Sequence, residues 1–158
     1  MTCVLGIDPG VSGGVAFYIP GTNLADVFDM PVVKAKRGKT AMDVDAEALQ
    51  LLIVGLRTPN RAFVEQVQSR PRQGGQFQFG VNYGRVLGVL EAAGIPITHV
   101  SASKWKPAMG LRGEGKLMSV KLAEQLFPHL KPKLYGPRGA GLDGRAEALL
   151  IAYYGATQ

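Results

Sequence analysis

The segment TCVLGIDPG, residues 2–10, is a short apolar run that stops at Asp8-Pro9-Gly10. An apolar, β-branched run that ends in proline and glycine predicts a buried strand followed by a turn. Asp8 then lies at the carboxyl end of this strand, beside buried surface, where a carboxylate is costly unless it is paired or bound to a cation. The segment therefore predicts both a core strand and an acidic side chain at its end.

Outward from this strand, the chain predicts three strands in a meander and then alternating helices and strands. The further strands are expected at residues 13–19, 24–30, 61–65 and 97–100. Helices are expected at 43–56 (capped by Asp43 or Asp45), at 81–93, from 103 to Pro107, at 116–127 and at 142–154, with loops at 34–40, 66–80 and 131–141. This order predicts an α/β fold, a mixed five-stranded sheet flanked by helices, in a single domain over residues 1–158.

Composition narrows the class of protein. The 158 residues are 46% hydrophobic, and 18 Lys and Arg against 12 Asp and Glu give a net charge of +6, which favours a polyanionic partner. The single cysteine, Cys3, excludes an internal disulfide, and His99 and His129 have no Cys or acid at metal-ligand spacing, so all three are expected to be structural. No apolar run is long enough for a membrane span and no secretory signal is seen, so we expect a cytoplasmic protein without a membrane partner.

Three further acids share the unusual setting of Asp8. Glu65 directly follows the apolar residues 62–64, and if the two strands are parallel neighbours, both carboxylates meet at one sheet edge. Asp143 and Glu147 are four residues apart on the last predicted helix and hence on one face, and Glu147 leads into the apolar run 148–152.

Four converging carboxylates would suit a divalent metal site. Mg²⁺ prefers oxygen ligands, and two such ions about 4 Å apart can activate a water and stabilise the leaving oxygen of a phosphodiester. The alternative is that each acid is a cap or turn residue, as Asp8 before Pro9-Gly10 or Asp143 at a helix start could be.

The ordered set of motifs resembles the RuvC family of Holliday-junction resolvases. The matching segments are GIDPG with Ser12-Gly13 (6–13), Val64-Glu65, GRVLG (84–88), Lys104-Trp105-Lys106, Lys116, and the acidic pair leading into ALLIA (148–152). The resemblance implies an RNase H-like fold, a homodimer, Mg²⁺ or Mn²⁺, and paired symmetric nicks in a four-way DNA junction. It also implies Asp8, Glu65, Asp143 and Glu147 as catalytic and metal-binding residues.

The sequence departs from the family at the last acidic pair. The familiar spacing is three residues, usually ending in Asp, whereas here it is four and ends in Glu. When the apolar run 148–152 is aligned with the corresponding run of the family, Glu147 takes the position of the family's last acid. Asp143 then lies one residue before the position of the family's preceding acid. Either a shifted helix start restores Asp143 as a ligand, or it supports the ligands indirectly.

Basic, amide and aromatic residues outside the acids are candidates for DNA binding. They are Arg70, Arg72, Gln73, Gln76, Phe77, Phe79, Lys104, Lys106, Arg112 and Lys116. The cations and a glycine-rich turn can contact phosphates, the glutamines can reach base edges, and the phenylalanines can stack on unpaired bases. In the alternative, the phenylalanines and Trp105 are core residues and the basic loop at 34–39 is merely solvated.

The helix at 81–93 is apolar nearly all round, with Gly84 and Gly88 four residues apart. It is either sandwiched within the fold or pairs with its twin across a two-fold axis, which would match a two-fold junction.

Three rival functions remain at this stage. A broader nuclease of flaps and forks uses the same acids. An actin- or hexokinase-type phosphate-binding ATPase would use the glycine-rich segment 6–14, but such proteins normally need a second lobe. A junction-binding protein without catalysis would explain the altered acidic spacing.

Overall fold

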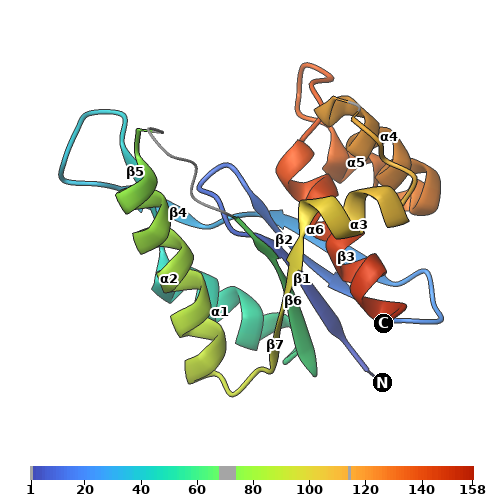
Figure 1. The fold of residues 1–158 in the computed structure, drawn as a ribbon, viewed down its shortest axis with the longest axis horizontal. Coiled ribbons are helices and arrows are strands. Elements are labelled where there is room, and N and C mark those ends of the chain that lie inside the picture. Colours follow the sequence, from blue (N-terminus) through green and yellow to red (C-terminus); the bar gives the residue numbers. More distant parts are fainter. Residues whose placement is uncertain (1, 68–73, 114) are drawn as a thin grey trace.

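The computed structural model describes residues 2–67, 74–113 and 115–158. The strands are β1 (Val4–Asp8), β2 (Gly14–Tyr18), β3 (Ala25–Asp29), β4 (Val32–Lys34), β5 (Met42–Val44), β6 (Arg61–Gln66) and β7 (Ile97–Ser101). The helices are α1 (Ala46–Leu56), α2 (Gln76–Ala92), α3 (Ala102–Ala108), α4 (Lys116–Leu126), the 3₁₀ turn η1 (Pro128–Leu130), α5 (Lys131–Leu134) and α6 (Asp143–Ala156). Figure 1 shows them arranged as a central sheet between two helical layers.

The central sheet has five strands in the order β3-β2-β1-β6-β7. β1 pairs antiparallel with β2 but parallel with β6, and β6 pairs parallel with β7. The predicted mixed five-stranded sheet is therefore confirmed, with the 2–10 segment in its middle strand. Because β1 and β6 are parallel neighbours, their carboxyl ends lie at the same edge, as expected for Asp8 and Glu65.

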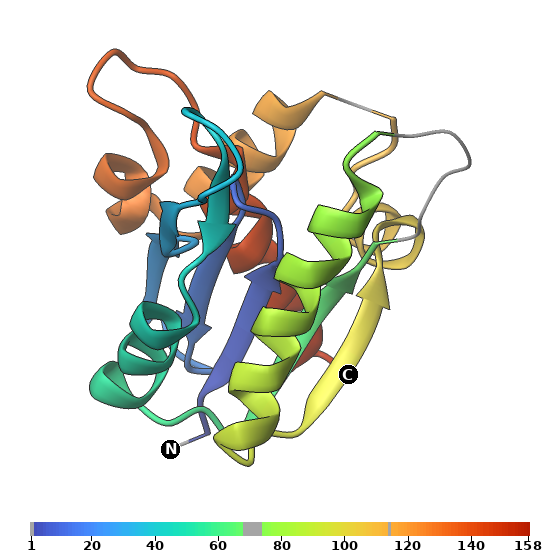
Figure 2. The ribbon, with the colours of Figure 1, turned by 90° about the vertical axis from the view of Figure 1, so that its left-hand side faces the viewer.

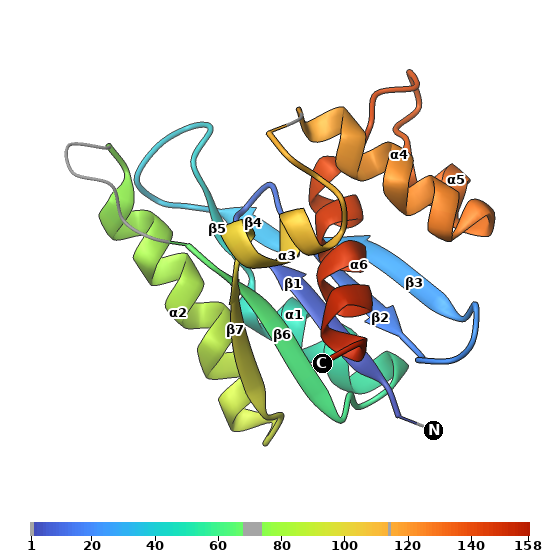
Figure 3. The same ribbon diagram turned by 45° about the vertical axis from the view of Figure 1, so that its right-hand side comes forward.

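Each face of the sheet is covered by its own helices. The α1 and α2 face buries Leu5 and Ile7 of β1, while the α6 face buries Val4 of the same strand. Figure 2 shows α1 and α2 in front of the sheet, and Figure 3 shows α6 on the opposite face. Alternate residues of a strand point to opposite faces, so Asp8 shares the α6 face with Val4 and Gly6.

The predicted boundaries were wrong in four places. Residues 32–34 and 42–44 form a β4–β5 hairpin, and residues 131–134, expected in a loop, form α5. α2 begins at Gln76 and not near Val81, because Gly75 (φ 77°) ends the preceding segment and residues 76–79 can all continue a helix. α3 extends one residue past Pro107, since a proline near the end of a short helix disrupts few backbone bonds.

No helix in the described ranges is long and apolar enough to span a bilayer.

Candidate active site

The four predicted acids come from three elements that meet at the carboxyl edge of the parallel strands. Asp8 ends β1, Glu65 lies in β6, and Asp143 and Glu147 belong to the first two turns of α6. The register pairs Gly6 with Phe63 and Ile7 with Val64, so Asp8 and Glu65 follow as the next neighbours across the two strands. Glu65 lies two residues after Phe63 and therefore on the same face of the sheet, and Phe63 belongs to the core on the α6 side. Both strand acids thus face α6.

Glycines bring α6 unusually close to β1 and β2. A Cβ atom on Gly6 would lie 2.1 Å from the backbone oxygen of Ala148, and one on Gly14 would lie 2.5 Å from that of Gly144. Real side chains cannot occupy such gaps, so only glycine permits this approach. The close packing sets Glu147, directly before Ala148, against the end of β1.

The acids act on one another electrostatically. The pKa of Asp8 is raised to about 7, chiefly by burial and then by the negative charges of Glu65, Glu147 and Asp143, against a lowering by the backbone at Gly10. Burial also raises the pKa of Glu65, which Trp105 and Lys106 partly oppose and Glu147 reinforces. The four carboxylates therefore lie near enough to one another to interact electrostatically, and their negative charges oppose the ionisation of Asp8.

Two side chains from α3 hold the buried acids in place. The indole Nε1 of Trp105 donates to Oε1 of Glu65 at 3.1 Å, and Nζ of Lys106 donates to Oε1 of Glu147 at 2.7 Å. The hydroxyl of Ser119 in α4 also donates to that Glu147 oxygen, at 3.2 Å. Trp105 is fully buried, as expected in the alternative that made it a core residue. It also orients Glu65 through its indole nitrogen.

Asp143 and Glu147 have different surroundings, as their altered spacing indicated. Glu147 is buried, whereas the side chain of Asp143 is 34% exposed and pairs with Nζ of Lys116 at 2.8 Å. Lys116 is itself 82% exposed, and its hydrogen bond with Asp143 raises its pKa. Lys106 and Lys116, predicted as DNA-binding cations, are thus also the counter-ions of the two helix acids.

A divalent cation fits the chemistry of this site. Its donors are carboxylate oxygens, which Mg²⁺ and Mn²⁺ prefer, and their mutual repulsion favours a bound positive charge. In the described part of the chain, however, no three Asp, Glu, His or Cys side chains are grouped closely enough to hold a metal as they stand. Two of the carboxylates instead pair with ammonium groups: Oε1 of Glu147 with Lys106 and Oδ2 of Asp143 with Lys116.

A cavity of about 650 Å³ opens beside Glu147 between α3 and α4. Three of the predicted DNA-binding cations line it, namely Lys106, Arg112 and Lys116, together with Ser103 and Ser119. Lys104 is exposed on α3 but does not line this cavity. The acids therefore lie next to a basic depression that can receive a phosphate.

Phe77 and Phe79, expected in a loop, lie in the first turn of helix α2. Phe77, in the first turn of α2, is 85% exposed, whereas Phe79 stacks on Tyr83 with ring centroids 6.3 Å apart. The Tyr83 hydroxyl is hydrogen-bonded to Nδ1 of His99 at 2.8 Å. Gln76 lies in the same helical turn as Phe77, while Arg70, Arg72 and Gln73 lie outside the described residues. Of the two phenylalanines, Phe77 is the exposed one, and Phe79 packs against a neighbouring ring.

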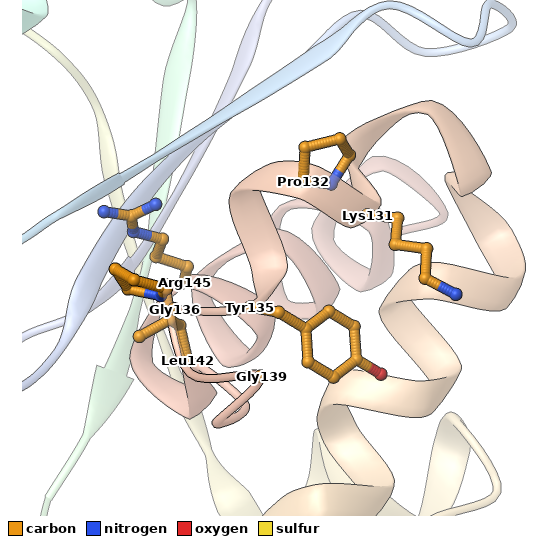
Figure 4. A pocket seen from close by; sticks show the side chains of 8 residues that line it. Lys131, Pro132, Tyr135, Gly136, Gly139, Leu142 and Arg145 are labelled. Carbon is orange, nitrogen blue, oxygen red and sulfur yellow. The ribbon is translucent and has the colours of Figure 1, made fainter.

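A larger cavity, of about 940 Å³, is lined by the segment that leads into α6 and by none of the four acids. Figure 4 shows Arg145 on one side of it and Lys131 with Tyr135 on the other. The Arg145 guanidinium donates to both carboxylate oxygens of Asp29, each at 2.7 Å, and to the backbone oxygen of Lys133. Arg145 thus serves to anchor α6 to β3.

Sequence reasoning missed Ser119 and the orienting role of Trp105. Ser119 carried no signal, because nothing in the sequence reveals that α4 packs beside α6. Trp105 lies between two lysines. A signal for its role was available, because the indole N–H of a tryptophan expected in the core needs a buried hydrogen-bond acceptor.

Comparison with solved structures gives extensive matches, although no protein-family model and no curated protein matches the chain. RuvC from Thermus thermophilus superposes with a TM-score of 0.65 at 22% identity, covering 99% of this chain and 96% of that one. T. thermophilus RuvC in complex with a Holliday junction substrate gives 0.64 at 21% identity, with the same coverage. The yeast mitochondrial Holliday junction resolvase Ydc2 gives 0.59 at 15% identity, covering 98% of this chain and 78% of that one.

The chain has the RuvC fold. The resemblance drawn from the motifs thus extends to the order and packing of the elements that carry Asp8, Glu65, Asp143 and Glu147.

Proposed function

We propose that this chain is a metal-dependent DNA endonuclease that resolves four-way junctions by paired symmetric nicks. The observation that carries the proposal is the meeting of four carboxylates at one sheet edge, within a fold that matches RuvC over 99% of the chain. One of the matched structures is a RuvC bound to a Holliday junction substrate, which supports the same class of substrate here.

Asp8, Glu65, Glu147 and Asp143 would hold two Mg²⁺ or Mn²⁺ ions. When bound, such ions supply a nucleophilic water at neutral pH and stabilise charge on the phosphodiester oxygens. Trp105 orients Glu65, while Lys106 and Ser119 orient Glu147, so two ligands are held by protein before any substrate arrives.

Lys106 and Lys116 would change partners during binding. In the free protein each neutralises a helix acid, and both line the basic cavity beside Glu147. With a cation bound, the acids would no longer need the two ammonium groups as counter-ions, and these groups could contact phosphate oxygens of the bound strand. The same cavity offers Arg112 to the phosphate backbone, and exposed Lys104 lies nearby on α3.

The branch point would be met by the start of α2. Phe77 projects from the helix and can stack on an unpaired base, with Gln76 beside it. Arg70, Arg72 and Gln73, which precede this helix, remain proposed DNA contacts on the strength of their sequence.

The direct test is cleavage of a mobile four-way junction with and without Mg²⁺ or Mn²⁺. We expect metal-dependent cutting by the wild-type protein, and loss of cutting with retained junction binding for Asp8→Asn and Glu65→Gln, because phosphate contacts do not depend on those carboxylates. Linear duplex, flap and fork substrates run in parallel separate a junction resolvase from a broader branched-DNA nuclease. Substantial cleavage by Asp8→Asn would end the proposal.

A further inference from the structure

The β4–β5 hairpin carries positive charge that the candidate active site does not use. Its strands pair antiparallel outside the central sheet, with Lys34 opposite Met42. Lys34, Lys36 and Lys39 are exposed, and none of them has an acidic partner among the described residues. Three unpaired lysines on one short hairpin repel one another, and an anion would relieve that repulsion.

The hairpin stands at the edge of the sheet that carries the acids. The backbone N–H of Met30, just before the hairpin, donates to the oxygen of Gly13 at 3.1 Å, in the turn that follows Asp8. Figures 1 and 2 show the hairpin tip and the beginning of α2 at the same end of the molecule. The hairpin tip therefore lies at the end of the molecule where α2 begins.

Side-chain hydrogen bonds at Asp43 stabilise the hairpin and join it to α2. The carboxylate of Asp43 accepts from Arg37 at 2.7 Å, from Nε2 of Gln78 at 2.7 Å and from Nδ2 of Asn82 at 3.3 Å. The hydrogen bond from Arg37 is the main cause of the lowered pKa of Asp43. A loop that merely displayed charge to water would not need a buried carboxylate with three donors.

Two further bonds join the same elements. The backbone N–H of Val44 donates to Oδ1 of Asn82, and Arg85 donates to the Val44 oxygen, both at 2.9 Å. Gln78, which reaches Asp43, directly follows Phe77 in α2. Hydrogen bonds thus join the basic hairpin to the helix that carries the exposed aromatic ring.

We propose that the β4–β5 hairpin is a DNA-contacting element that holds the phosphate backbone of a duplex arm through Lys34, Lys36 and Lys39. Arg37 is exposed but is paired with Asp43 within the hairpin, which leaves the three lysines for the phosphates. The inference rests on the proposed junction binding and adds an arm contact to it. Phosphate contacts of this kind supply affinity without reading sequence.

Binding of a four-way junction by the Lys34→Gln/Lys36→Gln/Lys39→Gln variant, titrated at several salt concentrations, tests the proposal. We expect an affinity at least about 10-fold weaker near 0.1 M salt, and a slope of log affinity against log salt that falls by about one per lysine in contact. Single Lys36→Gln should show part of this loss, whereas Arg57→Gln, an exposed cation at the opposite edge before β6, should show none. Hydroxyl-radical footprints should lose protection on a duplex arm in the triple variant.

Asp43→Asn separates hairpin docking from net charge. Removing a negative charge should tighten DNA binding if only the overall charge matters, whereas loosening the hairpin should weaken it several-fold. A thermal melt shows whether the variant is folded; if it is not, the triple lysine variant alone decides. Unchanged affinity and salt slope in the triple variant would overturn the hairpin proposal while junction binding by the wild type stands. Absence of junction binding by the wild type would overturn both.

Discussion

Asp8 has the most strongly perturbed surroundings of the four acids. It lies at the end of a buried strand, and three other carboxylates raise its pKa beyond the effect of burial. In the metal-free protein this side chain holds a proton near neutral pH that a free aspartate has lost. The residue is therefore both the centre of the candidate metal site and a source of instability without metal.

The stability of the metal-free protein should decrease as the pH rises from about 4 to about 7. The folded-state pKa of Asp8 is raised from its ordinary value of 3.8 to about 7, so the native state binds more protons than the unfolded state in this window. The free energy of unfolding then decreases with a slope of up to about 1.4 kcal/mol per pH unit. The raised pKa of Glu65 adds in the same direction.

Urea unfolding at pH 5 and pH 7.5 measures this slope, with Asp8→Asn as the control that should reduce it. Mg²⁺ should stabilise the wild-type protein more at pH 7.5 than at pH 5, because protons compete for the same oxygens. A slope that Asp8→Asn leaves unchanged would contradict the assignment of the raised pKa to Asp8.

Glu147 and Asp143 should not be equivalent in catalysis. Glu147 is buried and held by Lys106 and Ser119, whereas Asp143 is partly exposed and paired with an exposed lysine side chain, Lys116. Glu147→Gln should therefore lose most cleavage activity, and Asp143→Asn should lose about 10–100-fold if it supports the ligands indirectly.

Metal titrations of both variants separate weaker metal binding from slower chemistry. A comparable loss in the two variants would show that both carboxylates bind metal. Cleavage by Glu147→Gln at the wild-type rate at every metal concentration would show that the last acid of the site is misassigned.

At the scale of elements, the position of α6 depends on glycines in the strands beneath it. Gly6→Ala should be strongly destabilising, because its Cβ would lie 2.1 Å from the backbone oxygen of Ala148 and 2.4 Å from the nitrogen of Ala152. Overpacking of this kind costs about 1–3 kcal/mol and more when backbone must move. The displaced helix should also lower metal affinity, since it carries two of the four acids.

Gly55→Ala in α1 is the matched control, measured by the same urea unfolding. Nothing lies within 4 Å of a Cβ at Gly55, so this change should stabilise the protein by about 0.5–1 kcal/mol through helix propensity. Equal effects of the two substitutions would show that the approach of α6 to β1 does not depend on Gly6.

The elements differ in how far the sequence predicts them, and the reason is local. The strand that ends in Asp8 is an apolar run typical of a buried strand, so its place in the core was predictable. The proximity of Asp8 and Glu65 was predictable as well, because both acids follow apolar strands whose carboxyl ends share one sheet edge. The β4–β5 hairpin was not, because Val32 and Val33 are exposed and its stability comes from Asp43, whose partners lie in α2. Similarly, the lysine counter-ions of Glu147 and Asp143 depend on tertiary packing that no local pattern encodes.

At the scale of the whole molecule, α2 offers a face without a partner in the described part of the monomer. Gly80, Gly84 and Gly88 are exposed and recur every four residues, while Val86 and Leu90 turn inward to the sheet. A stripe of small residues on a helix of 17 residues allows a second helix to approach closely. Two-fold pairing through this face would place two sets of acids for two opposed nicks.

We therefore predict a homodimer that uses the outer face of α2. Sedimentation equilibrium should give twice the chain mass of 16.8 kDa, and Gly84→Arg should give the monomer, because a long charged side chain prevents close approach of two helices. The variant should stay folded, since nothing lies within 4 Å of a Cβ at Gly84 in the monomer. It should still nick one strand but should no longer convert a junction in a cruciform plasmid to linear DNA, because that conversion needs both nicks in one binding event. Gly55→Arg, in a similarly open helical position of α1, controls for added charge and bulk and should remain dimeric. A wild-type protein that sediments as a monomer under DNA-binding conditions, or a Gly84→Arg protein that still linearises the plasmid, would show that α2 does not form the dimer interface.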